Sequence, residues 1–150
     1  MTHQELIDKG VEWLSNNKNH CYRSPVILTE LRSHSRETPD IMGMNPNLST
    51  VIECKTTLDD FRADLKKSHR SQTPGMGNFR FYLCPKDIIP VPLVPYGWGL
   101  LYCEPTRISI RKQPQSHYEG VREEEYHILY SVVHRVTMRG LMEEIKKPLM

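Results

Sequence analysis

The sequence lacks both the cysteine spacing of a zinc-binding module and the cysteine density of a small disulfide-rich domain. Four cysteines occur among 150 residues, and no two of them stand in a C-x-x-C arrangement. Structural zinc sites and secreted disulfide scaffolds depend on such regular or dense cysteines. We therefore expect reduced, partly buried thiols, as in a cytoplasmic protein.

Long apolar runs are also missing. No segment reaches the roughly 20 apolar residues that a membrane-spanning helix needs. Residues 1–8 are polar and lack the basic start and apolar run of a signal peptide. The sequence thus predicts no membrane partner, and it contains neither an internal repeat nor a low-complexity tract.

An excess of one charge is absent as well, because the formal net charge is only +2. Such a value permits nucleic-acid binding without requiring it, since a local patch matters more than the sum. Hydrophobic residues make up 38% of the chain, which is enough for a core. The length suits a single domain that spans residues 1–150.

Apolar periodicity and turn residues predict alternating helices and strands. A capping box at Thr2 and Glu5 opens a first helix, which ends near Asn16. The expected strands cover residues 26–31, 40–44, 49–55, 79–84, 98–103 and 107–111, and the other helices cover 58–70 and 121–146. The order α-β-β-β-α-β, then a β-hairpin and a long C-terminal helix, predicts an α/β fold with a central mixed β-sheet flanked by helices.

Two segments carry further expectations. Four prolines lie between Pro85 and Pro95, so this stretch is expected to be an extended surface loop rather than a central strand. In the last helix, Tyr126, Leu129 and Val133 belong to an apolar stripe at helical spacing. Such a stripe is more often core than dimer surface, although a long terminal helix leaves dimerisation open.

A carboxylate–carboxylate–lysine set lies on the second and third expected strands. Alternation along a strand puts Glu53 and Lys55 on one face of an apolar segment, and a turn at residues 45–47 brings Asp40 alongside. Such buried charges need compensation, which a divalent cation supplies. The alternative is a surface carboxylate with a structural ion pair.

Phosphodiester hydrolysis needs groups of these types. Carboxylate oxygens hold Mg²⁺ or Mn²⁺, and a nearby lysine orients water or neutralises developing charge. Asp40 and Glu53 are therefore the expected metal ligands, with the backbone carbonyl of Cys54 as a further ligand. Lys55 is the expected catalytic lysine.

At these residues the chain resembles the PD-(D/E)xK nuclease superfamily, which has the restriction-endonuclease-like fold. The matching motifs are Pro39-Asp40 and Glu53-Cys54-Lys55, with 13 positions from Asp40 to Glu53. Residues 26–102 look closest to MmcB-type DNA repair proteins, and the glycine-containing segments 75–82 and 97–100 look like small nucleases of phages and mobile elements. The resemblance implies a metal-dependent deoxyribonuclease of a bacterial or phage-infected cell.

The superfamily also has a first acidic residue, usually on a helix. Glu30 is its candidate here and is counted among the catalytic residues, although we expect it on or after a strand. A salt bridge to Lys55 or Arg32 explains Glu30 equally well. Asp60 and Asp64 lie on one face of the next helix, where they either touch the site or serve the helix itself.

Basic and glycine-rich positions after the third strand are the expected DNA contacts. Basic side chains near a helix end meet phosphates, or they simply complement the helix dipole. A glycine-rich loop brings backbone N–H groups to a phosphate, or it is an ordinary loop. The expected DNA-binding residues are Lys67, Arg70, Gly75, Gly77, Asn78 and Arg80.

Taken together, the sequence predicts a Mg²⁺- or Mn²⁺-dependent DNA endonuclease in DNA repair or in phage or mobile-element DNA processing. The alternative is a catalytically silent DNA-binding or anti-defence module on the same fold. The chain has little room for a separate specificity domain. Targeting would then come from weak sequence preference, from DNA structure, from a homodimer or from a partner protein.

Overall fold

The structure, a computed structural model, describes residues 1–16, 21–35, 37–67, 75–118 and 121–149. Its elements are α1 (His3–Asn16), β1 (Val26–Thr29), β2 (Ile41–Met44), β3 (Ser49–Cys54), α2 (Leu58–Leu65), β4 (Phe79–Pro85), η1 (Val91–Leu93), β5 (Gly99–Cys103), β6 (Ile108–Lys112), α4 (Val121–Met138) and α5 (Met142–Ile145). The α/β class predicted from the sequence is confirmed.

The strands form one six-stranded sheet whose spatial order follows the chain, β1-β2-β3-β4-β5-β6. The β1–β2, β2–β3 and β5–β6 pairs are antiparallel, whereas β3–β4 and β4–β5 are parallel. Parallel neighbours need a crossover connection, and α2 lies in the one between β3 and β4. The predicted mixed sheet flanked by helices is therefore present.

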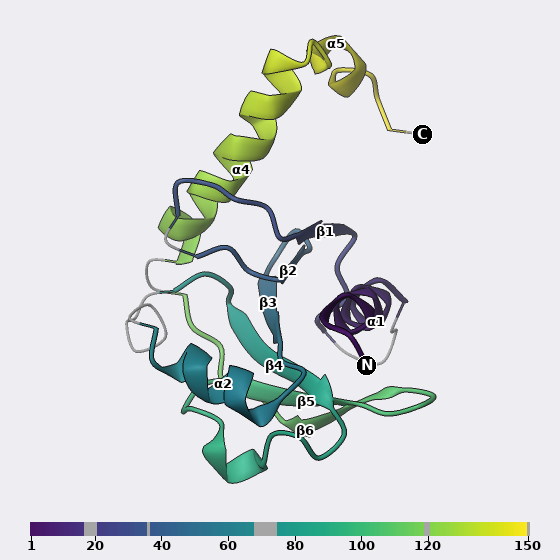
Figure 1. Cartoon of the computed structure of the whole chain (residues 1–150). Coiled ribbons are helices and arrows are strands. Elements are labelled where there is room, and N and C mark those ends of the chain that lie inside the picture. The colour runs from purple at the N-terminus through teal and green to yellow at the C-terminus, as the bar shows by residue number, and fades with distance from the viewer. Residues whose placement is uncertain (17–20, 36, 68–74, 119–120, 150) are drawn as a thin grey trace.

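Helices α1 and α2 cover opposite faces of this sheet (Figure 1). On the α1 side, Leu6 is fully buried in a cluster that includes Cys54 of β3. On the α2 side, Phe61 packs edge-on against Tyr82 of β4, with ring centroids 4.9 Å apart. Because strand residues alternate faces, Glu53 points to the α2 side.

Three local sequence signals define element boundaries, and the capping box and the turn among them were predicted. Thr2 N donates to Glu5 Oε2 (2.6 Å) and Glu5 N donates to Thr2 Oγ1 (3.1 Å), which closes the capping box of α1. Thr57 Oγ1 accepts from Asp60 N (3.1 Å) and caps α2. Asn45 Oδ1 accepts two backbone N–H groups in the β2–β3 turn. These signals fix the start of both helices and the hairpin between them.

The expectation of a surface loop between residues 85 and 95 is wrong in part. The segment contains η1, but Ile89 is 0% exposed and Val94 is 6% exposed, and both join the core under α2. The Tyr102 hydroxyl donates to the Ile89 carbonyl at 2.6 Å. Proline prevents ladder hydrogen bonds, yet it leaves neighbouring apolar side chains free to reach the core.

The long C-terminal helix also differs from expectation. It is divided into α4 and α5 near Gly140, whose φ is +69°. Ile128 is buried, but Tyr126, Leu129 and Val133 are 65%, 42% and 54% exposed rather than core, since α4 projects away from the sheet (Figure 1). Among the described helices, none is long and apolar enough to cross a membrane.

Candidate functional site

Asp40 stands directly before β2, at the corner where β2 meets the end of β3. Its Oδ2 atom accepts a hydrogen bond from the backbone N–H of Cys54 (2.8 Å), and its side chain is 16% exposed. The N–H and carbonyl of one strand residue face the same neighbour, so the Cys54 carbonyl also faces the β2 side. The hairpin thus brings Asp40 beside the segment Glu53–Lys55, as the sequence indicated.

Two further ligand-type side chains lie at this corner. His3 Nε2, from the first turn of α1, lies 3.4 Å from Asp40 Oδ1 and 3.7 Å from Glu30 Oε1. Glu30 follows β1, and its N–H donates to the Asp40 carbonyl at 3.1 Å. One ligand atom from each of these three residues lies within 4.8 Å of the others. Imidazole and carboxylate oxygens together suit a divalent transition metal.

His3 could not be identified as a site residue from the sequence. Its only local signal is its place directly after the capping residue Thr2, which makes it a first-turn residue of α1. That this turn meets the ends of β1 and β2 is a consequence of tertiary packing. Glu30, whose role the sequence left open, pairs with His3 in the described structure.

Negative charge gathers around the end of β3. Glu53 is 4% exposed and lies opposite Tyr82 in the parallel β3–β4 register, outside the group formed by His3 and its two carboxylates. Burial raises the pKa of the Cys54 thiol far above its usual range, and the charges of Asp40 and Glu53 raise it further, while Lys55 lowers it. A concentration of carboxylates of this kind is a setting that favours a bound cation.

Lys55 is held by a buried aspartate of α2. Its Nζ lies 3.1 Å from Asp64 Oδ1, and Nζ of Lys67 lies 3.2 Å from the same atom. Tyr82 donates its hydroxyl to Asp64 Oδ2 at 2.7 Å. The Lys55 side chain is 12% exposed and the Lys67 side chain is 54% exposed, so Lys67 is the more accessible of the two.

A hollow of about 310 Å³ opens between the start of α1, the end of β3 and α2. Of the group formed by His3, Glu30 and Asp40, His3 lines this hollow, and so do the two lysines that contact Asp64. Its lining residues are His3, Cys54, Lys55, Asp60, Ala63, Asp64 and Lys67. A phosphate in this hollow would meet positive charge on one side and the His3 cluster on the other.

The glycine-rich positions expected to contact DNA are buried instead. Gly77 has φ +90° and donates its N–H to Glu125 of α4 (3.1 Å), while Asn78 N donates to Ser49 Oγ (3.0 Å). A side chain at Gly75 would collide with the buried guanidinium of Arg80. The backbone N–H groups of Gly77 and Asn78 are therefore bonded inside the molecule and are not open to a phosphate.

Arg80 also lies inside the molecule. It is 8% exposed, its guanidinium carbon lies 5.0 Å from the centre of the Trp98 ring, and its Nη2 lies 3.5 Å from His117 Nδ1. A direct DNA contact therefore does not fit Arg80. Lys67 keeps its accessible position at the hollow, and Arg70 lies outside the described residues.

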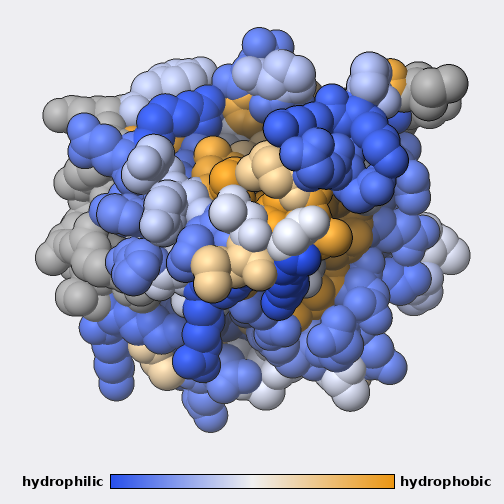
Figure 2. Space-filling view, turned by 90° about the horizontal axis from the view of Figure 1, so that it is seen from above, coloured by the Kyte–Doolittle hydropathy of each residue, from blue (hydrophilic) through white to orange (hydrophobic). Residues whose placement is uncertain are grey.

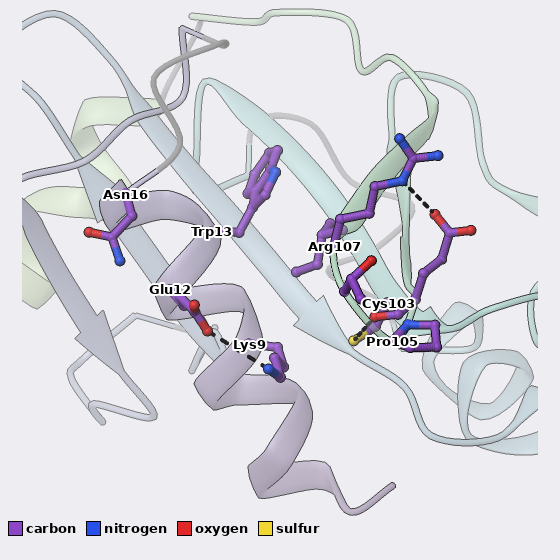
Figure 3. Close-up of a pocket in the computed structure, with 10 residues that line it drawn as sticks. Lys9, Glu12, Trp13, Asn16, Cys103, Pro105 and Arg107 are labelled. Carbon is purple, nitrogen blue, oxygen red and sulfur yellow. Dashed lines mark hydrogen bonds and ion pairs between the residues drawn. The ribbon is translucent and has the colours of Figure 1, made fainter.

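A second hollow, of about 260 Å³, lies between α1 and the β5–β6 turn (Figure 3). Its charged side chains pair with one another, Lys9 with Glu12 (3.9 Å) and Arg107 with Glu104 (3.4 Å). Among the described residues, the group of side chains close enough together to hold a metal ion is His3, Glu30 and Asp40. None of these three lines the second hollow. We therefore assign the candidate site to the corner at Asp40.

The fold defines a mixed α/β protein with a six-stranded sheet. No protein-family model and no curated protein matches the chain. Among solved structures, it is similar to the SPO1766 protein of unknown function from Silicibacter pomeroyi, with a TM-score of 0.60 and 19% sequence identity, over 100% of this chain and 98% of that chain. At this identity the likeness extends to the fold alone.

Proposed function

We propose that this protein is a divalent-metal-dependent deoxyribonuclease with a restriction-endonuclease-like core. The observation that carries the proposal is the corner at the end of β3. There Asp40 Oδ2 accepts a hydrogen bond from the backbone N–H of Cys54, and one ligand atom each of Asp40, His3 and Glu30 lies within 4.8 Å of the others. Lys55 lines the same hollow as His3. Carboxylates, an imidazole and a lysine are the groups that metal-assisted phosphodiester hydrolysis uses.

The order of elements supports the fold assignment. The antiparallel β2–β3 hairpin carries the motif residues, and α2 returns the chain to β4, parallel to β3. The resemblance of Pro39-Asp40 and Glu53-Cys54-Lys55 to the PD-(D/E)xK superfamily implies the same arrangement.

Asp40, Glu30 and His3 would hold the cation, and Glu53 adds carboxylate charge beside the Cys54 backbone. When bound, a divalent cation polarises the phosphate and lowers the pKa of a water molecule. Because one ligand is an imidazole, the set suits Mn²⁺ better than Mg²⁺, which prefers oxygen ligands and keeps its waters. We therefore expect higher activity with Mn²⁺.

The lysines act on the phosphodiester itself. Asp64 holds the Lys55 ammonium at the hollow, where it neutralises charge on a phosphoryl oxygen as water attacks phosphorus and the P–O bond breaks. Lys67, more exposed, offers a second positive charge to a neighbouring phosphate. Both roles need an ammonium group at the rim of the cavity and no sequence-specific base contact.

The test is cleavage of supercoiled, linear, single-stranded and branched DNA by the purified protein with Mn²⁺ or Mg²⁺. Asp40→Asn should lower the rate at least about a hundredfold while the protein stays folded, because a metal ligand is lost. Asp59→Asn, an exposed change on α2 outside the hollow, is the matched control and should cleave normally. Cleavage of DNA by pure Asp40→Asn protein at the wild-type rate would contradict the proposal. DNA binding without Mn²⁺ binding or cleavage would instead favour the catalytically silent module.

A further inference from the structure

The ring of Tyr82 is held inside the molecule, in the cluster between α2 and the sheet. Figure 2 shows apolar residues gathered within a hydrophilic rim at the end from which α4 and α5 project, whereas Tyr82 is 0% exposed. Trp98 stacks on its ring with centroids 4.5 Å apart, and Phe61 of α2 meets it edge-on at 4.9 Å. A ring packed in this way has few alternative orientations, so the hydroxyl of Tyr82 has a defined position.

This hydroxyl reaches the carboxylate that holds the two lysines at the hollow. Tyr82 donates to Asp64 Oδ2 at 2.7 Å. The Nζ atoms of Lys55 and Lys67 lie 3.1 and 3.2 Å from the other oxygen, Asp64 Oδ1. A fixed donor on one carboxylate oxygen restricts rotation of the group, and this defines where the other oxygen holds an ammonium group.

Strand β4 thus holds Lys55 at both ends. The backbone N–H of Lys55 donates to the Leu83 carbonyl at 2.8 Å. Its ammonium group is connected through Asp64 to Tyr82, the residue directly before Leu83. A lysine side chain loses much rotamer freedom when it is ordered. Ordering it before a substrate arrives removes that cost from the reaction.

We propose that Tyr82 is a positioning residue for Lys55, acting through Asp64. Its effect on catalysis rests on the proposed nuclease function, whereas the positioning of the ammonium group does not. Phenylalanine at this place would keep the ring contacts with Trp98 and Phe61 and would remove only the donor to Asp64. A role in packing alone therefore predicts no change at Lys55, and a positioning role predicts a released ammonium group.

Reductive methylation of the folded full chain, followed lysine by lysine with peptide mass spectrometry, tests the positioning independently of cleavage. Tyr82→Phe should raise the methylation rate of Lys55 about tenfold, because a hydrogen bond to a charged group no longer fixes Asp64. Tyr102→Phe is the matched control. Tyr102 is 6% exposed in the same cluster, and its hydroxyl donates to the Ile89 carbonyl at 2.6 Å, so this change removes a buried hydrogen bond away from Asp64.

The control separates positioning from a general loss of stability. Lys55 should be methylated at the wild-type rate in Tyr102→Phe, even though both variants should unfold at a lower urea concentration than the wild-type protein. Equal methylation of Lys55 in the wild-type and Tyr82→Phe proteins would overturn the proposal. The same acceleration in both variants would also overturn it, because it would show destabilisation alone.

Initial rates of DNA cleavage at saturating Mn²⁺ test the consequence for catalysis. Tyr82→Phe should lower kcat about tenfold, with Mn²⁺ affinity unchanged because the corner at Asp40 keeps its ligands, and Tyr102→Phe should keep the wild-type kcat. An unchanged kcat in Tyr82→Phe would contradict a catalytic effect of the positioning. A wild-type protein that cleaves no DNA would instead contradict the proposed function, and the methylation rates would still decide the role of Tyr82.

Discussion

At the scale of single residues, the hollow depends on one buried carboxylate. Asp64 is 1% exposed, and its oxygens meet the hydroxyl of Tyr82 and the ammonium groups of Lys55 and Lys67. A buried anion is stable only when donors of this kind surround it. Asp64 also fixes the positions of both ammonium groups, so it acts as a positioning residue for the proposed phosphate site.

Replacing Asp64 by asparagine should therefore destabilise the fold and loosen both lysines. We expect the free energy of unfolding to fall by about 2 kcal/mol, because charge-assisted hydrogen bonds are lost at a buried position. Urea denaturation measures the change. Asp60→Asn, an exposed change on the same helix, should have a much smaller effect. Equal loss in the two variants would show that burial of Asp64 is not what matters.

Residue types along the chain predicted part of the site. Asp40, Glu53 and Lys55 stand out because strand alternation and a short hairpin are local properties. His3 does not, since its neighbours Glu30 and Asp40 come from strands far along the chain. The expectation for Gly77 and Asn78 was wrong for the same reason, because only tertiary packing brings Glu125 and Ser49 to their amides.

At the scale of elements, α4 is attached to the sheet through a buried glutamate. Glu125 is 2% exposed and accepts hydrogen bonds from Ser49 Oγ (2.5 Å), Gly77 N (3.1 Å) and Arg122 Nη1.

Glu125→Ala should lower the free energy of unfolding by about 3 kcal/mol, because buried donors lose their acceptor. Amide hydrogen exchange should quicken in α4 first. Glu123→Ala, at an exposed position in the same turn, should change little; a similar loss there would contradict this account.

His117, in the segment between β6 and α4, contacts the residues at the start of β4. Its Nε2 lies 2.8 Å from the Gly77 carbonyl, which requires a proton on Nε2, and its Nδ1 faces Arg80. Burial lowers the pKa of His117 below its usual 6.5, and the Arg80 charge lowers it further. The neutral ring is therefore the form that the fold favours.

The sign of the pH dependence follows from that lowered pKa. Stability contributed by His117 is present above about pH 6.5 and is lost as the pH falls below it, because the unfolded chain then binds the proton more readily. Urea midpoints from pH 7.5 down to pH 5 should fall less steeply in His117→Gln than in the wild-type protein. His127→Gln, exposed on α4, should keep the wild-type slope. An unchanged slope in His117→Gln would rule out this contribution.

Elements were predictable where their signals are local. The capping box at Thr2 and the turn at Asn45 predicted the start of α1 and the β2–β3 hairpin correctly. The side of α4 that packs against the sheet could not be predicted from the sequence, because apolar residues occupy both sides of the helix. The expectation of a surface loop for the proline-rich segment was also wrong in part. Proline restricts backbone hydrogen bonding, but it does not determine whether neighbouring side chains are buried.

At the scale of the whole molecule, the fold brings four segments of the chain to one corner. The start of α1, the residue after β1, the β2–β3 hairpin and α2 contribute residues to the candidate site. The order of elements predicted the mixed sheet and the crossover through α2. It did not predict which end of α1 would meet the hairpin, and that end supplies His3.

The central claim is that this corner binds a divalent cation, and a Mn²⁺ titration followed by electron paramagnetic resonance tests it most directly. The signal of free Mn²⁺ should decrease saturably with the wild-type protein and with Asp59→Asn. Asp40→Asn should abolish this loss of signal, and His3→Ala should weaken binding at least about tenfold, because each change removes a ligand atom. Equal Mn²⁺ binding by the wild-type and Asp40→Asn proteins, or no binding by either, would contradict the account.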